Sequence, residues 1–218
     1  MCHAGIAPML QRGELVRRVM RLDPRPQQHT RLKATGRGTK IQTTEDVFNR
    51  TAGSKLAAGQ HQRIGYIGGW EGASTQRDRE KGFSDELTRN GQSLYAREIG
   101  NFNLDEARQA ARKMFTRKDF PDAVFVANDA MAIAVIDVIR FELGLKVPEQ
   151  VSVVGYDDVP ISSSPAYDLT TVRQPANRMV AETVSILIEN IENKTTTARR
   201  IEIDGPLMVR GSAKISDA

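Results

Sequence analysis

The sequence predicts an α/β fold built on a doubly wound parallel sheet, and three observations support this prediction. Strand-like and helix-like segments alternate along residues 41–218, which is the pattern of a parallel sheet with helices on both faces. The main strand-like segments are short apolar runs, as expected for strands buried on both sides. Polar residues directly follow several of these runs, and ligands of such sheets bind outside the carboxyl ends of the strands.

The composition is that of an ordinary globular protein, with 39% hydrophobic and 27% charged residues in 218 positions. The single cysteine excludes an internal disulfide and fits a reducing compartment. The longest apolar stretch, at residues 130–139, is too short to span a membrane. Residues 1–20 lack the continuous apolar core of a secretory signal. We therefore expect a cytoplasmic protein with no membrane partner.

Residues 1–40 form a basic leader that differs from the rest of the chain. They hold nine Lys/Arg and two Asp/Glu, a balance of +7, whereas residues 41–218 hold the other 22 Lys/Arg and 25 Asp/Glu, a balance of −3. A basic arm can bind nucleic acid, but this one has no aromatic residue and no recognisable helix-turn-helix pattern. We expect the leader to be disordered or foreign to the fold.

The first half of the remaining chain predicts two strand–helix units. In chain order these are a helix at residues 49–58, a strand at 63–69, a helix at 74–90, a strand at 94–99 and a helix that begins at Asn103. Gly68 and Gly69 lack the spacing of a phosphate-binding loop, so we expect them only to turn the chain toward a cleft. Asn103 with Glu106 three residues later predicts a capping box.

Residues 121–159 are the centre of the predicted sheet. Ala123–Val126 is a buried strand, Asn128 and Asp129 stand at the cap of the following helix, and residues 151–154 form the next strand. The helix, at residues 129–143, carries one apolar stripe of Met131, Ala134, Val135, Val138 and Ile139. Gly144 is expected to end it.

The last elements are a strand at residues 169–173, a helix at 176–193 and strands at 200–203 and 207–210. Gln174-Pro175 breaks the chain between the first two of these. The helix is the most clearly amphipathic of the chain, with a stripe of Val180, Val184, Leu187, Ile188 and Ile191.

No catalytic or metal-binding motif is recognisable, so we expect neither an enzyme nor a cofactor. The three histidines are far apart, the cysteine is alone, and no Walker loop, GxSxG or HExxH pattern occurs. Asp157-Asp158 could be a carboxylate pair, but adjacent residues of an extended segment point to opposite sides. An enzyme on this sheet would need a nucleophile, metal or cofactor motif, which weighs against that alternative.

The remaining candidate site is a set of side chains at strand ends: Arg79, Phe102, Asn128, Asp129 and Asp157. Carboxylates and amides bond hydroxyl groups, and a flat ring packs against the apolar face of a pyranose, so the set suits a polyhydroxylated ligand. A purely structural interpretation stays open, in which Asn128 and Asp129 cap a helix, Asp157 makes a turn and Arg79 is solvated.

Three segments in particular resemble the lac repressor (LacI/GalR) family of bacterial transcription regulators. They are VFVANDAMA at 124–132, VPEQVSVVGYDD at 147–158 and LTTVRQP at 169–175, and HQRIGYIGG at 61–69 and LMVRGS at 207–212 agree in order and spacing. The resemblance covers roughly residues 41–212. It implies a periplasmic-binding-protein-like fold of two subdomains, a small effector such as a sugar held between them, and a homodimer.

Carried over residue by residue, the resemblance implies effector contacts from the five side chains of the candidate site. It also implies the domain plan: 41–174 mainly the second subdomain, 175–204 a remnant of the first, and 205–218 a tail. Family members carry a helix-turn-helix headpiece, which reaches operator DNA, followed by most of the first subdomain, and neither is recognisable here. Because its native partners belong to the first subdomain, we expect the stripe of the helix at 176–193 to lack partners. The alternatives are a periplasmic-type sugar-binding protein for transport and a truncated, non-functional fragment.

Overall fold

The computed structural model describes residues 40–43, 45–58, 61–193, 200–203 and 205–215. The prediction for residues 1–40 therefore falls outside the described residues except at Lys40. The first elements are β1 (Lys40–Thr43), α2 (Glu45–Ala58), β2 (Ile64–Gly68), α3 (Ser74–Arg89), β3 (Ala96–Ile99) and α4 (Leu104–Phe115). The next are β4 (Ala123–Val126), α5 (Asp129–Asp137), a π-helix η1 (Val138–Glu142), β5 (Ser152–Asp157) and a 3-10 helix η2 (Pro160–Ser163). The last are β6 (Thr170–Arg173), α6 (Ala176–Glu192), β7 (Arg200–Ile203) and β8 (Leu207–Met208).

A six-stranded sheet forms the centre of the fold, in the order β3-β2-β4-β5-β6-β8. The first five strands are parallel, which confirms the predicted parallel sheet. The last strand differs from the prediction, because β8 is shorter than expected and pairs antiparallel with β6. The strand order reverses direction between β2 and β4, and such a switch point is where open α/β sheets place their ligands.

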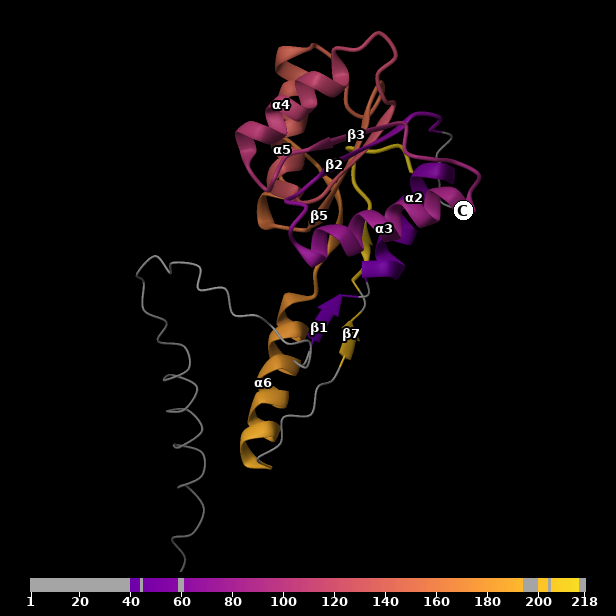
Figure 1. The fold of residues 1–218 in the computed structure, drawn as a ribbon. Coiled ribbons are helices and arrows are strands. Elements are labelled where there is room, and N and C mark those ends of the chain that lie inside the picture. The colour runs from indigo at the N-terminus through magenta and orange to yellow at the C-terminus, as the bar shows by residue number, and fades with distance from the viewer. Residues whose placement is uncertain (1–39, 44, 59–60, 194–199, 204, 216–218) are drawn as a thin grey trace, which may run out of the picture. The chain divides into compact units, whose positions relative to one another are not determined.

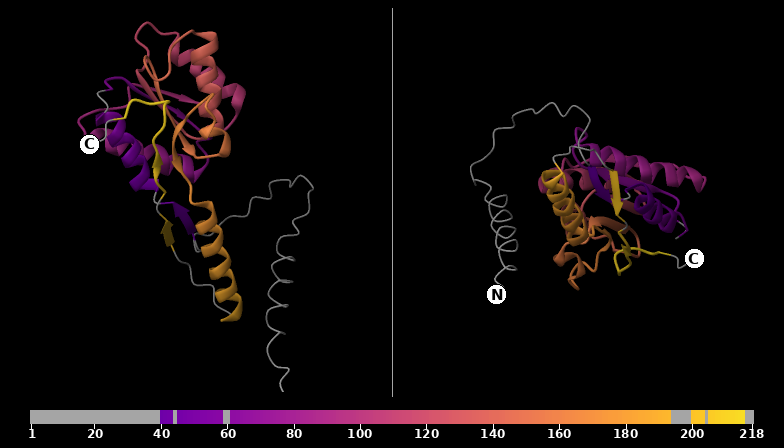
Figure 2. Two further views of the ribbon diagram at one scale, coloured as in Figure 1. Left: turned by 180° about the vertical axis from the view of Figure 1, so that it is seen from behind. Right: turned by 90° about the horizontal axis from the view of Figure 1, so that it is seen from below.

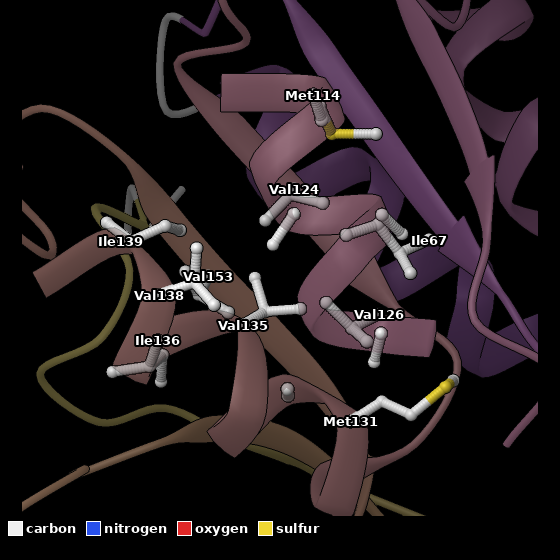
Figure 3. Close-up of a cluster of buried hydrophobic side chains, with 14 of the residues drawn as sticks. Ile67, Met114, Val124, Val126, Met131, Val135, Ile136, Val138, Ile139 and Val153 are labelled. Atoms are coloured by element: carbon white, nitrogen blue, oxygen red, sulfur yellow. The ribbon is translucent and has the colours of Figure 1, made fainter. Parts of the chain in front are cut away.

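Helices cover both faces of this sheet, with α4 and α5 on one side and α2 and α3 on the other (Figures 1 and 2). Alternation along β4 produces this layering, since successive side chains of a strand point to opposite faces. Val124 and Val126 pack under α4 and α5 (Figure 3), whereas Ala123 and Phe125 face α2 and α3. The continuous apolar run of this strand thus supplies two separate cores.

The helix predicted at residues 129–143 changes its winding in the structure. It is α-helical as α5 and then becomes the π-helix η1, with the amide of Leu143 donating to the carbonyl of Val138 at 3.0 Å. Gly144 follows with φ +66°, a conformation that favours glycine. The helix ends at Gly144 as predicted, and the predicted apolar stripe of the helix is buried.

Residues 40–43 differ from the predicted domain plan. They form β1, which pairs in parallel with β7 in a separate two-stranded sheet, and α6 contacts β1. The segment therefore associates with residues of the 175–204 region and not with the large sheet. Of the predicted stripe on α6, Val180, Leu187 and Ile191 are exposed, while the buried residue of the helix is Ile186.

Across the described residues, no helix combines the length and the apolar character needed to cross a bilayer.

We expect Phe125→Ala to lower the free energy of unfolding by about 3–5 kcal/mol, because it removes a ring from a buried core. Phe125 packs against both Tyr66 and Phe83, with ring centroids 5.8 Å and 4.8 Å away. The control is Phe141→Ala, at a side chain that is 80% exposed, which should change stability by less than about 0.5 kcal/mol. Urea unfolding measures both, and equal losses would contradict the assigned core.

Candidate functional site

The carboxyl ends of β2, β4, β5 and β6 meet at one edge of the sheet, because these strands are parallel neighbours. Neighbouring strands are about 4.8 Å apart, so the ends of β2 and β5 are separated by roughly 10 Å. The five predicted site residues all follow strands that end at this edge or come from the helix after β2. Their side chains, however, take different roles.

Arg79 is buried beneath this edge and is not solvated. It comes from the second turn of α3, is only 6% exposed, and its guanidinium carbon lies 3.5 Å from the centroid of the Tyr156 ring. One terminal nitrogen donates to the carbonyl oxygen of Ala127. The Nε atom is buried and has no hydrogen-bond partner. A buried cation is rare unless other groups bond it, and here the Ala127 carbonyl and the Tyr156 ring are two such groups.

Asp157 lies close enough to Arg79 for the two charges to interact. Burial raises the pKa of the Asp157 carboxyl above its ordinary value, while the charge of Arg79 and a hydrogen bond from the Gln174 side chain act in the opposite direction. The backbone of Asp157 has φ +124°, a strained conformation for any residue other than glycine. Arg79, Asp157 and Gln174 therefore form one polar group at the ends of β5 and β6.

Sequence reasoning missed Gln174, which it treated only as part of a break before Pro175. The position of Gln174 in the sequence could have identified it as a site residue. It directly follows β6, and the predicted site residue Asn128 likewise stands just after β4. In a parallel sheet, residues at equivalent strand ends lie at the same edge.

Phe102 is presented by a tight turn at the end of β3. Asn101 and Phe102 have φ +52° and +56°, and the amide of Asn103 donates to the carbonyl of Gly100 at 2.8 Å. The ring is 40% exposed and lies against Gly69, where a Cβ atom would stand 2.1 Å from it. The glycine after β2 therefore makes room for the aromatic ring as well as turning the chain.

Glu106 stabilises this turn and does not complete the predicted capping box. The Asn103 side chain accepts from the amides of Asp105 and Glu106, as an N-cap should. The carboxylate of Glu106 instead accepts from the Asn101 side chain at 2.6 Å. Only one arm of the predicted box forms, and the other stabilises the strained residue beside Phe102.

Asn128 caps α5 as the structural interpretation proposed. Its Oδ1 atom accepts from the amide of Met131 at 3.0 Å, and the side chain is half-buried. The cap occupies the oxygen of the amide group, which leaves the nitrogen as the part of the side chain suited to a ligand.

Asp129 points into the protein and not toward the edge. It is fully buried, and its carboxylate accepts from the amide of Val159 at 3.0 Å and from the hydroxyls of Ser162 at 2.7 Å and Thr171 at 2.5 Å. Gly155 makes this possible, since a Cβ atom there would stand 2.3 Å from the carboxylate. The carboxylate that sequence reasoning offered to a ligand is thus saturated by the chain's own donors.

Asp158 points away from Asp157, as the alternation of an extended segment predicts. Its carboxylate bonds Arg210 at 2.6 Å and Arg173 at 2.5 Å. Burial alone would raise the pKa of the Asp158 carboxyl, but hydrogen bonds and charges from these two arginines hold it below its ordinary value. Of the two adjacent carboxylates, Asp157 therefore belongs to the candidate site, and Asp158 stabilises the fold.

Across the described residues, no group of three or more His, Cys, Asp and Glu side chains is placed to hold a metal ion.

Comparisons with known proteins agree with this fold. The periplasmic binding protein-like domain family matches residues 54–213. The repressor PurR of Photobacterium profundum is 32% identical over 80% of this chain and 53% of its own length. A CelR–cellobiose complex is 31% identical, with a TM-score of 0.75 over 81% of this chain and 54% of that one. A lac repressor dimer bound to operator and the anti-inducer ONPF is 28% identical, with a TM-score of 0.73 over 79% of this chain and 60% of that one. The chain thus spans about half the length of these relatives.

Asp129→Ala should lower the free energy of unfolding by about 3 kcal/mol, because it leaves buried donors from three segments unpaired. Thr171→Val removes one of these donors and should cost only about 1 kcal/mol. The exposed Asp119→Ala is the control. Chemical denaturation measures all three, and a loss at Asp129 no larger than that at Asp119 would contradict the assigned role.

Stability should also fall at acid pH through Asp158. Its pKa is lower in the folded protein than in the unfolded chain, so its contribution is complete above the ordinary carboxyl value of about 4 and is lost as pH falls through the folded value. Asp158→Asn should flatten this part of the stability–pH curve, recorded by thermal melts from pH 7 downward. A curve of unchanged slope would show that the arginine pair does not depend on this charge.

Proposed function

The chain belongs to the periplasmic binding protein-like family, as the effector-binding part of a LacI-type regulator, and from this premise we propose that it binds a sugar-like effector. The observation that supports this most is the buried Arg79 beside Asp157 at the carboxyl ends of β4 and β5. Such a pair offers one donor group and one acceptor group at the carboxyl ends of the strands, which is the arrangement that adjacent hydroxyls of a sugar require.

We assign the contacts as follows. Asp157 and Gln174 bond ligand hydroxyls, the Arg79 guanidinium group donates to them as well, and the amide nitrogen of Asn128 donates beside them. The Phe102 ring covers the apolar face of the sugar. Asp129 belongs to the site as a positioning residue, because it fixes the ends of the strands that carry Asp157 and Gln174. The ligand spans roughly 10 Å, from the end of β2 to the end of β5.

In this proposal the bound effector shifts an equilibrium between two states of a homodimeric, cytoplasmic regulator and so changes its affinity for operator DNA. DNA contact itself requires a recognition element such as a helix-turn-helix headpiece. No catalytic step is involved. The relatives that match are named as transcription repressors, which disfavours the alternative of a transport binding protein.

The direct test is a thermal melt of the chain with monosaccharides, disaccharides, sugar phosphates and purines. A cooperative melt that a sugar moves to higher temperature supports the proposal, because a ligand that binds only the folded state stabilises it. If a purine raises the melting temperature and no sugar does, the effector is a purine and not a sugar. A transition that nothing moves would favour a non-functional fragment.

Arg79→Ala and Asp157→Ala should each weaken binding of that sugar by about 1–3 kcal/mol, or roughly 5- to 150-fold, since each removes a buried polar partner. The control is Glu142→Gln, at an exposed residue of η1 that pairs with Arg112. Titration calorimetry gives the affinities. Unchanged affinity in both alanine variants would refute the assignment of the site.

A further inference from the structure

The turn after β2 presents the only tryptophan of the chain to solvent. Trp70 is 61% exposed, although an indole is among the largest apolar side chains and gains much from burial. Its ring lies over Gly72, where a Cβ atom would stand 2.2 Å from it. The amide of Ala73 donates to the carbonyl of Trp70 at 3.0 Å and closes the turn. The exposed ring is thus seated on a glycine within a closed turn.

Polar contacts fasten this turn to the scaffold at both ends. The amide of Gly69 donates to the buried side chain of Gln76 at 2.8 Å. Arg77 donates to the carbonyl oxygen of Glu71 at 3.0 Å. The carboxylate of Glu71 pairs with Arg97 of β3 at 2.8 Å. The turn is therefore pre-organised, and the exposure of its tryptophan does not result from a loose loop.

This turn also carries the first aromatic contact of the candidate site. The Phe102 ring stands over Gly69 and the Trp70 ring over Gly72. Three trans peptide bonds separate these glycines, so their Cα atoms lie at most about 11 Å apart. Two exposed rings are therefore held over one short turn, each at a different glycine.

We propose that Trp70 is a specificity-determining residue that packs against the second ring of a disaccharide, so that the site prefers disaccharides to monosaccharides. The inference rests on the proposed function and names its ligand more closely. The first ring lies between Phe102 and the polar group at the ends of β5 and β6, and the second lies on the indole. A rigid aromatic surface is the contact that such a ring needs, because it covers apolar area at little cost in conformational entropy.

The single tryptophan makes the test direct. Cellobiose, at concentrations that raise the melting temperature, should shift the intrinsic tryptophan emission to shorter wavelengths, while glucose should leave it unchanged. By calorimetry, we expect cellobiose to bind about tenfold more tightly than glucose. Trp70→Ala should bring this ratio close to one, and Trp70→Tyr should retain most of it. The control is Tyr95→Ala, at a 47% exposed ring that precedes β3 and should leave the ratio unchanged.

The outcomes separate the two proposals. If cellobiose stabilises the chain but leaves the emission unchanged, or if Trp70→Ala keeps the ratio, the role of Trp70 is refuted and the proposed function stands. If no sugar stabilises the chain, both are refuted. Should Trp70→Ala fail to fold, Trp70→Leu decides the matter, because leucine keeps an apolar side chain but has no flat ring. The ratio should then fall close to one at unchanged glucose affinity, and an unchanged ratio would refute the role of Trp70.

Discussion

The hydrogen bonds to the buried carboxylate of Asp129 are the interaction on which the carboxyl-end edge of the sheet depends. A desolvated carboxylate is very unfavourable unless donors surround it, and here its donors come from three places in the chain. They are the amide of Val159, the hydroxyl of Ser162 in η2 and the hydroxyl of Thr171 in β6. The start of α5 is thereby tied to the segments that follow β5 and to β6. Asp157 and Gln174 lie immediately beside these ties, so their positions are set by the same carboxylate.

Backbone strain is concentrated at the residues that face the proposed ligand. Phe102 and Asp157 both have positive φ values, as do their neighbours Asn101 and Asp158. Such conformations cost about 1–3 kcal/mol each and persist only where surrounding contacts impose them. Glu106 holds Asn101, and two arginines hold Asp158. The strained residues therefore present Phe102 and Asp157 in fixed positions before any ligand arrives, which reduces the entropy lost on binding.

Glycines make the close approaches at this edge possible. Gly155 leaves space for the carboxylate of Asp129, Gly69 for the ring of Phe102, and Gly72 for the ring of Trp70. Each of these glycines lies where a side chain, from another strand end or from the same turn, packs directly against the backbone. The edge is consequently built in part from side chains packed directly on glycine backbone.

The sequence by itself determined the alternation of strands and helices, the burial of β4 on both faces, the cap at Asn128 and the family resemblance. These are local or periodic properties, and they are written in neighbouring residues. Only the tertiary structure decided which way the polar side chains point. Asp129 finds partners 30 to 42 residues further along the chain, Arg79 packs on Tyr156, and residues 40–43 pair with β7. No local pattern encodes such contacts, because they arise only when the sheet brings distant segments together.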